Sequence, residues 1–105
     1  MKPERFDPVA RNEYLDALRW YRERNVEAAV RFRDDVLDTI ASICEFPQRS
    51  PLAPGVPRDL HVQKRLLGSV PYSIVYVELD TEILIIAVAH ARRRHTYWRG
   101  RLPPK

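Results

Sequence analysis

The first half of the chain carries hydrophobic residues at helical spacing in two consecutive segments. Within residues 27–45 they follow one another by three or four positions, and residues 9–24 show the same period behind Asp7, a suitable N-cap, and Pro8, which fits a first helical turn. A short break at Asn25 separates the segments, and we expect Asn25 to end the first helix in the left-handed conformation. This pattern predicts an antiparallel hairpin of two helices. The residues of the two apolar faces are Ala10, Tyr14, Ala17, Leu18 and Tyr21, and Ala29, Phe32, Val36, Ile40 and Ile43.

The second half changes to strand spacing after a proline-rich loop. Four prolines and Gly55 fall within residues 47–57, and no regular helix or strand tolerates that density. Beyond the loop, apolar and polar residues alternate in residues 60–66 and 72–77, whereas residues 83–89 are apolar throughout. Short turn sequences separate these three segments, which therefore predict an antiparallel meander.

With a short edge strand expected at residues 4–7, the predicted order is β-α-α-β-β-β. This order indicates an α+β fold, in which the helical hairpin packs on one face of a mostly antiparallel sheet. Because residues 83–89 are apolar on both faces, we expect that strand to be central in the sheet. Residues 1–105 have the length of one domain, and a basic segment, residues 90–105, follows the central strand directly.

Positive charge is concentrated in the second half. Residues 1–46 carry 8 basic and 10 acidic residues, whereas residues 47–105 carry 10 basic and 4 acidic residues. The three aspartates within residues 34–38 are expected on the solvated face of the second helix. Residues 90–101 combine arginine with aromatic residues and contain no acid, and arginine suits planar contacts to phosphate or carboxylate. The segment therefore indicates a surface for a polyanion or for an acidic partner.

Several classes of protein are disfavoured by the same sequence. The longest apolar run, residues 83–89, is far shorter than a membrane span, and the N-terminus lacks the apolar region of a signal peptide. Cys44 is the only cysteine and lies beside an apolar helix face, so we expect a buried core cysteine in a reducing cytoplasm, without membrane contact. The three histidines lack metal-ligand spacing, and no glycine-rich loop is present, so neither a metal nor a cofactor is expected.

One group of residues has the chemistry of a possible active site. Arg65 lies near the end of the first meander strand and His90 at the end of the third, and these two strands point the same way. We therefore expect both to lie around one concavity with Arg93, Arg94 and Tyr97. Such residues suit metal-free RNA cleavage, in which His or Tyr transfers a proton and Arg stabilises the charge developing on the phosphate. They also suit a patch that binds an anion or a partner without chemistry, and the residue types alone favour that interpretation.

Three segments resemble the RelE/ParE superfamily of bacterial type II toxins, long labelled plasmid stabilization proteins. Residues 70–76 read VPYSIVY and are similar to the family's PYxIxY strand, and residues 87–93 read AVAHARR and are similar to its xVxHxxR strand end. Tyr97 and Trp98 match a common YW close. The resemblance covers about residues 5–99 and implies the same β-α-α-β-β-β order in a bacterial cytoplasmic protein.

The resemblance implies the toxin component of a toxin–antitoxin system, with two alternative targets. RelE-like members cut mRNA in the ribosomal A site, and in that case Arg65, His90, Arg93 and Tyr97 are the catalytic candidates. ParE-like members inhibit DNA gyrase and lack that catalytic set. A binding module of the same fold that has lost both activities is a further alternative.

Two departures place the resemblance nearer to ParE than to RelE. Ser73 and Ala91 occupy positions that are often basic in RelE-like members. We therefore expect gyrase inhibition, with the basic segment as a docking surface rather than a nuclease site. The residues expected to bind the target or an anion are Lys64, Arg65, Arg92, Arg93, Arg94, Trp98, Arg99 and Arg101.

An antitoxin partner is implied by every toxin interpretation. In this family the antitoxin covers the toxin with an extended segment. The excess of positive charge in residues 47–105 requires a complementary surface. We therefore expect an acidic, partly disordered antitoxin encoded beside this chain.

Overall fold

The computed structural model describes residues 1–104 and has the predicted α+β architecture. No helix in that range is long and apolar enough to cross a membrane. The elements are β1 (Glu4–Phe6), α1 (Pro8–Arg24), α2 (Val26–Glu45), β2 (Val62–Leu66), β3 (Tyr72–Glu78) and β4 (Ile83–His90), with short 3-10 helices at Pro47–Arg49, Arg58–Leu60 and Arg99–Arg101.

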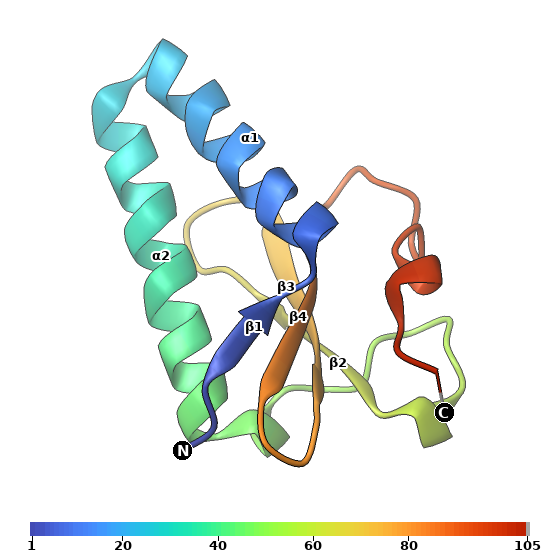
Figure 1. The fold of residues 1–105 in the computed structure, drawn as a ribbon. Helices are drawn as coiled ribbons and strands as arrows, with labels where there is room; N and C mark the ends of the chain where they lie inside the picture. Colours follow the sequence, from blue (N-terminus) through green and yellow to red (C-terminus); the bar gives the residue numbers. More distant parts are fainter. Residues whose placement is uncertain (105) are drawn as a thin grey trace.

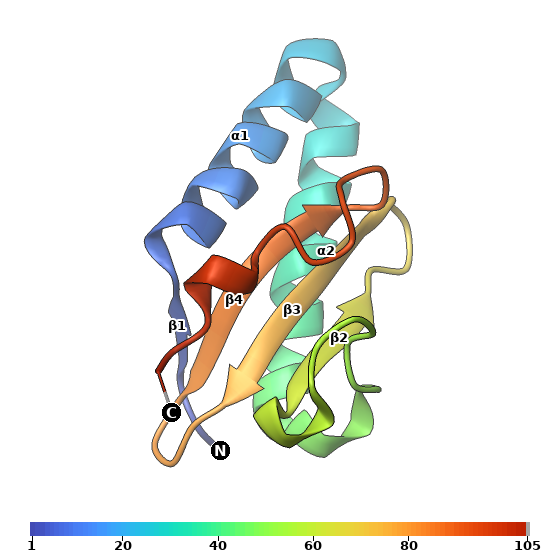
Figure 2. The ribbon, with the colours of Figure 1, turned by 90° about the vertical axis from the view of Figure 1, so that its right-hand side faces the viewer.

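The sheet has the strand order β1-β4-β3-β2. The meander strands pair antiparallel, and β1 pairs in parallel with the first residues of β4. The strand β4 is therefore internal and buried on both faces, as its apolar sequence predicted. The helical hairpin covers one face of the sheet, and the C-terminal segment covers the other (Figures 1 and 2).

The core between helices and sheet is built from the predicted apolar faces. Phe32, Val36, Ile40 and Ile43 of α2 are buried against Ile74, Tyr76, Ile83, Ile85 and Val88 of the sheet. Aromatic rings fill the end of this core farthest from the chain termini, where Phe32 lies 5.3 Å from Tyr72 and 5.2 Å from Tyr21 between ring centroids. Such pairs contribute beyond the apolar area that they bury.

The hairpin connection differs from the prediction in one respect. Asp7 caps α1 as expected, because its Oδ1 accepts from the backbone N–H of Val9, and Pro8 follows at the first helical position. Asn25, however, is extended, with φ −162° and ψ 112°, so the predicted left-handed conformation is wrong. Its side chain instead accepts from the N–H of Ala28, because a one-residue connection must cap the second helix as well as end the first.

A second apolar core lies on the opposite face of the sheet. A register shift pairs Val75 with Ala87 and Tyr76 with Ile85, so Ile86 is an extra residue on β4, and both Ile86 and Ala87 face this second core. The C-terminal segment covers it through the side chain of Trp98. The buried members are Ala53, Val62, Val75, Val77, Leu84, Ile86, Ala87, Ala89 and Trp98.

One predicted surface carboxylate has a structural role instead. Asp35 of α2 accepts hydrogen bonds from the backbone N–H and the hydroxyl of Ser69, at 2.9 and 2.7 Å. It thereby ties α2 to the turn between β2 and β3. The expectation that all three aspartates of residues 34–38 are merely solvated is wrong for this one, because the turn folds back onto α2.

Candidate functional site

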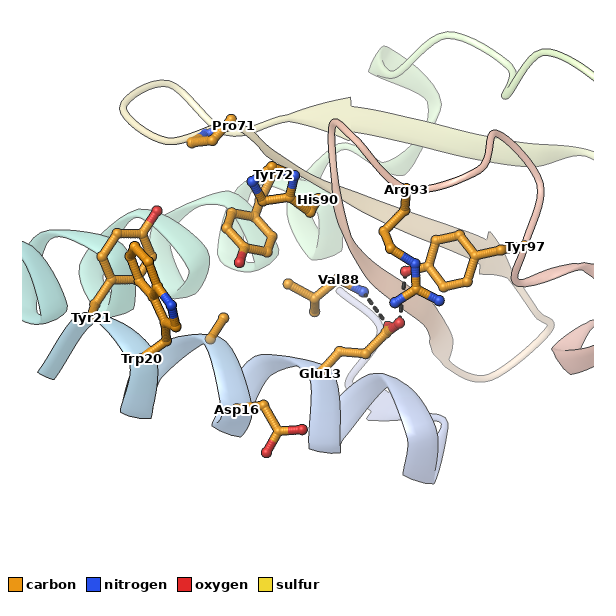
Figure 3. A pocket seen from close by; sticks show the side chains of 11 residues that line it. Glu13, Asp16, Trp20, Tyr21, Pro71, Tyr72, Val88, His90, Arg93 and Tyr97 are labelled. Carbon is orange, nitrogen blue, oxygen red and sulfur yellow. Dashed lines mark hydrogen bonds between the residues drawn. The ribbon is translucent and has the colours of Figure 1, made fainter. Parts of the chain in front are cut away.

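Glu13 of α1 connects the helix, the sheet and the C-terminal segment. Its carboxylate accepts from the hydroxyl of Tyr97 at 2.6 Å and from the backbone N–H of Val88 at 3.1 Å (Figure 3). It also accepts from Arg101 Nη1 at 2.8 Å. The side chains of Glu13 and Arg101 are only 14% and 15% exposed. We call Glu13, Tyr97 and Arg101 the Glu13 clamp.

The shortness of β1 explains why a carboxylate lies here. The last pair of β1 with β4 is Phe6 with Ile85, so the edge of β4 beyond that point has no neighbouring strand. Glu13 satisfies the N–H of Val88, and Arg101 donates to the carbonyl of Ile86 at 3.1 Å. Buried backbone groups need such partners. The clamp therefore completes the sheet edge and also holds the C-terminal segment in place.

The clamp engages the hydroxyl of Tyr97. Burial and the hydrogen bond to the Glu13 carboxylate raise the pKa of the Tyr97 phenol well above its ordinary value. A phenol of ordinary pKa is already protonated at neutral pH, so what the clamp adds is a fixed direction for this proton, which is donated to Glu13. Transfer of the proton to a substrate would first require this hydrogen bond to break.

A groove of about 620 Å³, which we call the aromatic groove, opens between α1 and the end of the sheet. Figure 3 shows its side chains converging from α1, β3, β4 and the C-terminal segment. Three of the five residues expected around one concavity line it, namely His90, Arg93 and Tyr97, whereas Arg65 and Arg94 do not. The lining residues are Glu13, Asp16, Ala17, Trp20, Tyr21, Pro71, Tyr72, Val88, His90, Arg93 and Tyr97.

Arg65 has a structural role away from this groove, so its predicted place beside His90 is wrong. Its Nε donates to Ser50 Oγ and its Nη1 to Ser42 Oγ, both at 2.7 Å. Alternation along β2 directs Arg65 toward the C-terminal end of α2, while its neighbour Lys64 lines a hollow on the other face of the sheet. Arg65 therefore lines neither the aromatic groove nor the hollow that Lys64 lines.

That hollow, which we call the basic hollow, is lined by side chains of the second sheet face and the C-terminal segment. It holds Arg94, the remaining residue of the expected concavity, and it shares His90, Arg93 and Tyr97 with the aromatic groove. The complete lining is Ala53, Pro54, Lys64, Ser73, Ala89, His90, Ala91, Arg93, Arg94, His95, Tyr97 and Trp98.

His90 lies between the two concavities. Its Nδ1 accepts from the backbone N–H of Arg92 at 3.0 Å, and its ring meets the edge of Tyr72 with centroids 4.9 Å apart. The hydrogen bond to Nδ1 leaves the proton of the neutral ring on Nε2. Within residues 1–104, no cluster of His, Cys, Asp or Glu has the arrangement of a metal site.

The predicted binding surface loses two of its members to the interior. Trp98 is only 4% exposed in the second core, and Arg101 is paired with Glu13, so neither presents itself to a target. Arg92, Arg94 and Arg99 are exposed, and no ion pair or side-chain hydrogen bond engages them in the part of the chain that the structure describes. Arg93 is also exposed and lies 4.0 Å over the ring of Tyr97.

Glu13 was missed in the sequence, although a signal for it was present. It lies three residues after Ala10 and four before Ala17, both buried in the helix-facing core. A carboxylate at that spacing lies on the apolar face of the helix, where it needs a partner. Its two principal partners lie more than eighty residues away, so the sequence did not indicate which they are.

Comparisons with known proteins agree with this architecture. Residues 5–95 match the model of the family described as "ParE toxin of type II toxin-antitoxin system, parDE". A solved structure described as the "Chromosomal ParDE TA system from P. aeruginosa" contains a chain with a TM-score of 0.73 and 17% sequence identity, covering 88% of this chain and 98% of that one. At that identity the likeness concerns the fold alone. No curated protein matches the sequence significantly. Since the family model spans most of the chain and the fold agrees with it, this protein belongs to the ParE family, the toxins of type II toxin–antitoxin systems.

Proposed function

We propose that this toxin binds DNA gyrase and inhibits it without cleaving nucleic acid. The observation that carries the proposal is the Glu13 clamp. The tyrosine that a RelE-like nuclease would use donates its hydroxyl proton to Glu13, and its raised pKa makes loss of that proton still less favourable. A site that acts by binding needs no proton acceptor at this position.

The distribution of the cations supports the same proposal. Arg65 is bonded to Ser42 and Ser50, and Arg101 is bonded to Glu13, so neither is free to neutralise a reacting phosphate. The exposed Arg92, Arg94 and Arg99 instead form an open basic surface on the C-terminal segment. Exposed charges of one sign accelerate association with an oppositely charged surface and direct its orientation.

The target is tested by inducing the toxin in bacterial cells and measuring two responses. Gyrase poisoning predicts early induction of the DNA-damage response while protein synthesis continues. Early arrest of translation without DNA damage would contradict the proposal. If induction leaves growth unaffected, the chain is a binding module without toxin activity.

The second candidate is a ribosome-dependent mRNA endonuclease, which is favoured by one observation. His90 and Arg93 line the same groove, and the Nε2 of His90 carries no described hydrogen bond within residues 1–104. His90→Ala separates the two functions. It should leave toxicity unchanged if gyrase is bound, and it should abolish toxicity if His90 transfers a proton.

We further propose that the partner is a ParD-type antitoxin whose acidic segment covers the basic C-terminal surface. The description of the family as part of parDE systems supports this partner. The unpaired arginines supply the charge complementarity, and the adjacent aromatic groove offers apolar contacts to Trp20 and Tyr72.

The antitoxin proposal is tested in two steps. The neighbouring reading frame should encode a small acidic protein. Its complex with the toxin should dissociate more readily as salt rises, and Arg92→Gln with Arg94→Gln should weaken it more than Arg31→Gln on the outer face of α2. If Arg31→Gln weakens the complex as much as Arg92→Gln with Arg94→Gln does, the antitoxin binds outside the basic C-terminal surface.

A further inference from the structure

The basic hollow has the form of a small anion site. Its volume is about 40 Å³, which suits one small group at its mouth. The short side chains of Ser73 and Ala89, which pair across β3 and β4, leave this space open. The hollow therefore has room for one small group and not for a nucleoside.

The charges around the hollow have a single sign. Lys64, Arg93 and Arg94 line it together with His90 and His95, and no carboxylate does. None of the three permanent cations has an ion pair within residues 1–104. This part of the surface therefore keeps an uncompensated positive potential.

Ser73 adds an independent observation. It is only 3% exposed, it lines the hollow, and its hydroxyl makes no hydrogen bond in the described part of the chain. Its strand neighbours Tyr72 and Ile74 face the helices, so alternation directs Ser73 to the opposite face. The Ser73 hydroxyl is therefore an unengaged donor on the wall of the basic hollow, available to a ligand oxygen.

The rim of the hollow is fixed by the proline-rich loop. Gly55 has φ +84°, and a Cβ added there would lie 2.9 Å from Thr96 Cγ2 and 3.3 Å from the His95 ring. The loop therefore packs directly against the residues that follow Arg94. This packing holds His95 in place at the rim of the hollow.

We propose that the basic hollow binds one phosphate of a nucleic-acid backbone. The Ser73 hydroxyl donates to a phosphate oxygen, and Lys64, Arg93 and Arg94 neutralise its charge. Arg92, which is exposed and adjoins Arg93 in the chain, contacts a neighbouring phosphate. The hollow itself is too small for a base, so its contact is to the backbone. The expectation that the strand is DNA, rather than RNA, rests on the proposed gyrase target.

The site is tested without gyrase, so that its failure is distinct from failure of the proposed target. Purified toxin is titrated into end-labelled DNA and RNA strands of one sequence, and fluorescence anisotropy is followed over a range of salt concentrations. Ser73→Ala should weaken binding about fivefold with an unchanged salt dependence, because it removes one neutral hydrogen bond to a charged group. Arg94→Gln should lower the slope of log affinity against log salt by about 0.7–0.9, the value for one lost phosphate contact.

Arg31→Gln is the matched control, because Arg31 is an exposed arginine on α2, outside the hollow. The proposal predicts that it changes affinity far less than Arg94→Gln. Three results would overturn the phosphate site: no binding of either strand, equal effects of Arg31→Gln and Arg94→Gln, or full affinity for a strand with an uncharged methylphosphonate backbone. Complete displacement of the labelled strand by inorganic phosphate at the same concentration as the strand would assign the hollow to the free ion. That result would overturn the proposal that the hollow binds a nucleic-acid backbone.

Discussion

Replacing Glu13 by glutamine tests the role of the clamp in stability. The substitution keeps the shape of the side chain but removes the charge that Tyr97 and Arg101 contact. Hydrogen bonds to charged groups contribute about 1.5–3 kcal/mol, and a buried ion left without its partner costs about 3–5 kcal/mol. Because the glutamine amide can still accept one hydrogen bond, we expect the free energy of unfolding to fall by about 3 kcal/mol, the lower end of the range for a buried ion without its partner. At about 4–8 °C per kcal/mol, Tm should fall by on the order of 10 °C or more.

The assay is urea unfolding followed by circular dichroism, and the chain offers a matched control. Asp16 lies one turn after Glu13 on α1 and pairs with Arg19, but both side chains are more than 60% exposed. Asp16→Asn should therefore change the free energy of unfolding by less than about 1 kcal/mol, as for most surface ion pairs. The contrast between the two carboxylates isolates the effect of burial.

A double variant separates the ion pair from simple loss of packing. Glu13→Gln leaves Arg101 buried without a counter-charge, whereas Glu13→Gln with Arg101→Met leaves no charge in the clamp. The double variant should therefore be less destabilised than the sum of the two single variants. Strict additivity, or a Glu13→Gln effect no larger than that of Asp16→Asn, would show that the buried ion pair does not stabilise the fold.

Three further predictions concern other contacts. Burial acts to raise the pKa of Asp35, but the hydrogen bonds from Ser69 outweigh it and hold that pKa below its ordinary value of 3.8. The stability that the Asp35 carboxylate adds is present above pH 3.8 and is lost as pH falls through its folded pKa. Asp35→Asn should therefore lower the free energy of unfolding at neutral pH and match wild type in strong acid. Urea unfolding at both pH values measures this difference. Gly55→Ala should lower the free energy of unfolding by about 1–3 kcal/mol, because alanine is strained at φ +84° and its Cβ meets Thr96. An unchanged Tm in thermal unfolding would contradict the close contact between Gly55 and Thr96. Tyr97→Phe should weaken the fold but leave toxicity per folded molecule unchanged in a growth assay, whereas complete loss of toxicity would favour the nuclease.

The helices and strands were predictable because their signals are local. The apolar residues of α2 and the doubly apolar β4 follow from sequence period, and both are buried where the period placed them. Asn25 was assigned the wrong conformation because its residue type suits both a left-handed helix end and an N-cap.

The site was less predictable because it depends on contacts between distant residues. Arg65 was grouped with His90 from strand direction, but its neighbours on the helix-facing side are Ser42 and Ser50. Trp98 was counted as a surface residue because it lies among arginines, yet it fills the second core. Composition identifies such a basic segment, whereas only the fold distinguishes its buried residues from its free ones.

Gyrase supercoiling by purified components distinguishes gyrase from the ribosome as the target. Wild-type toxin, His90→Ala and Tyr97→Phe are each titrated against gyrase and relaxed plasmid, and the same samples are incubated with translating ribosomes. A gyrase-binding toxin should inhibit supercoiling in all three forms and leave mRNA intact. Uninhibited supercoiling at a large molar excess of toxin, together with mRNA cleavage that His90→Ala or Tyr97→Phe abolishes, would contradict the proposal that gyrase is the target.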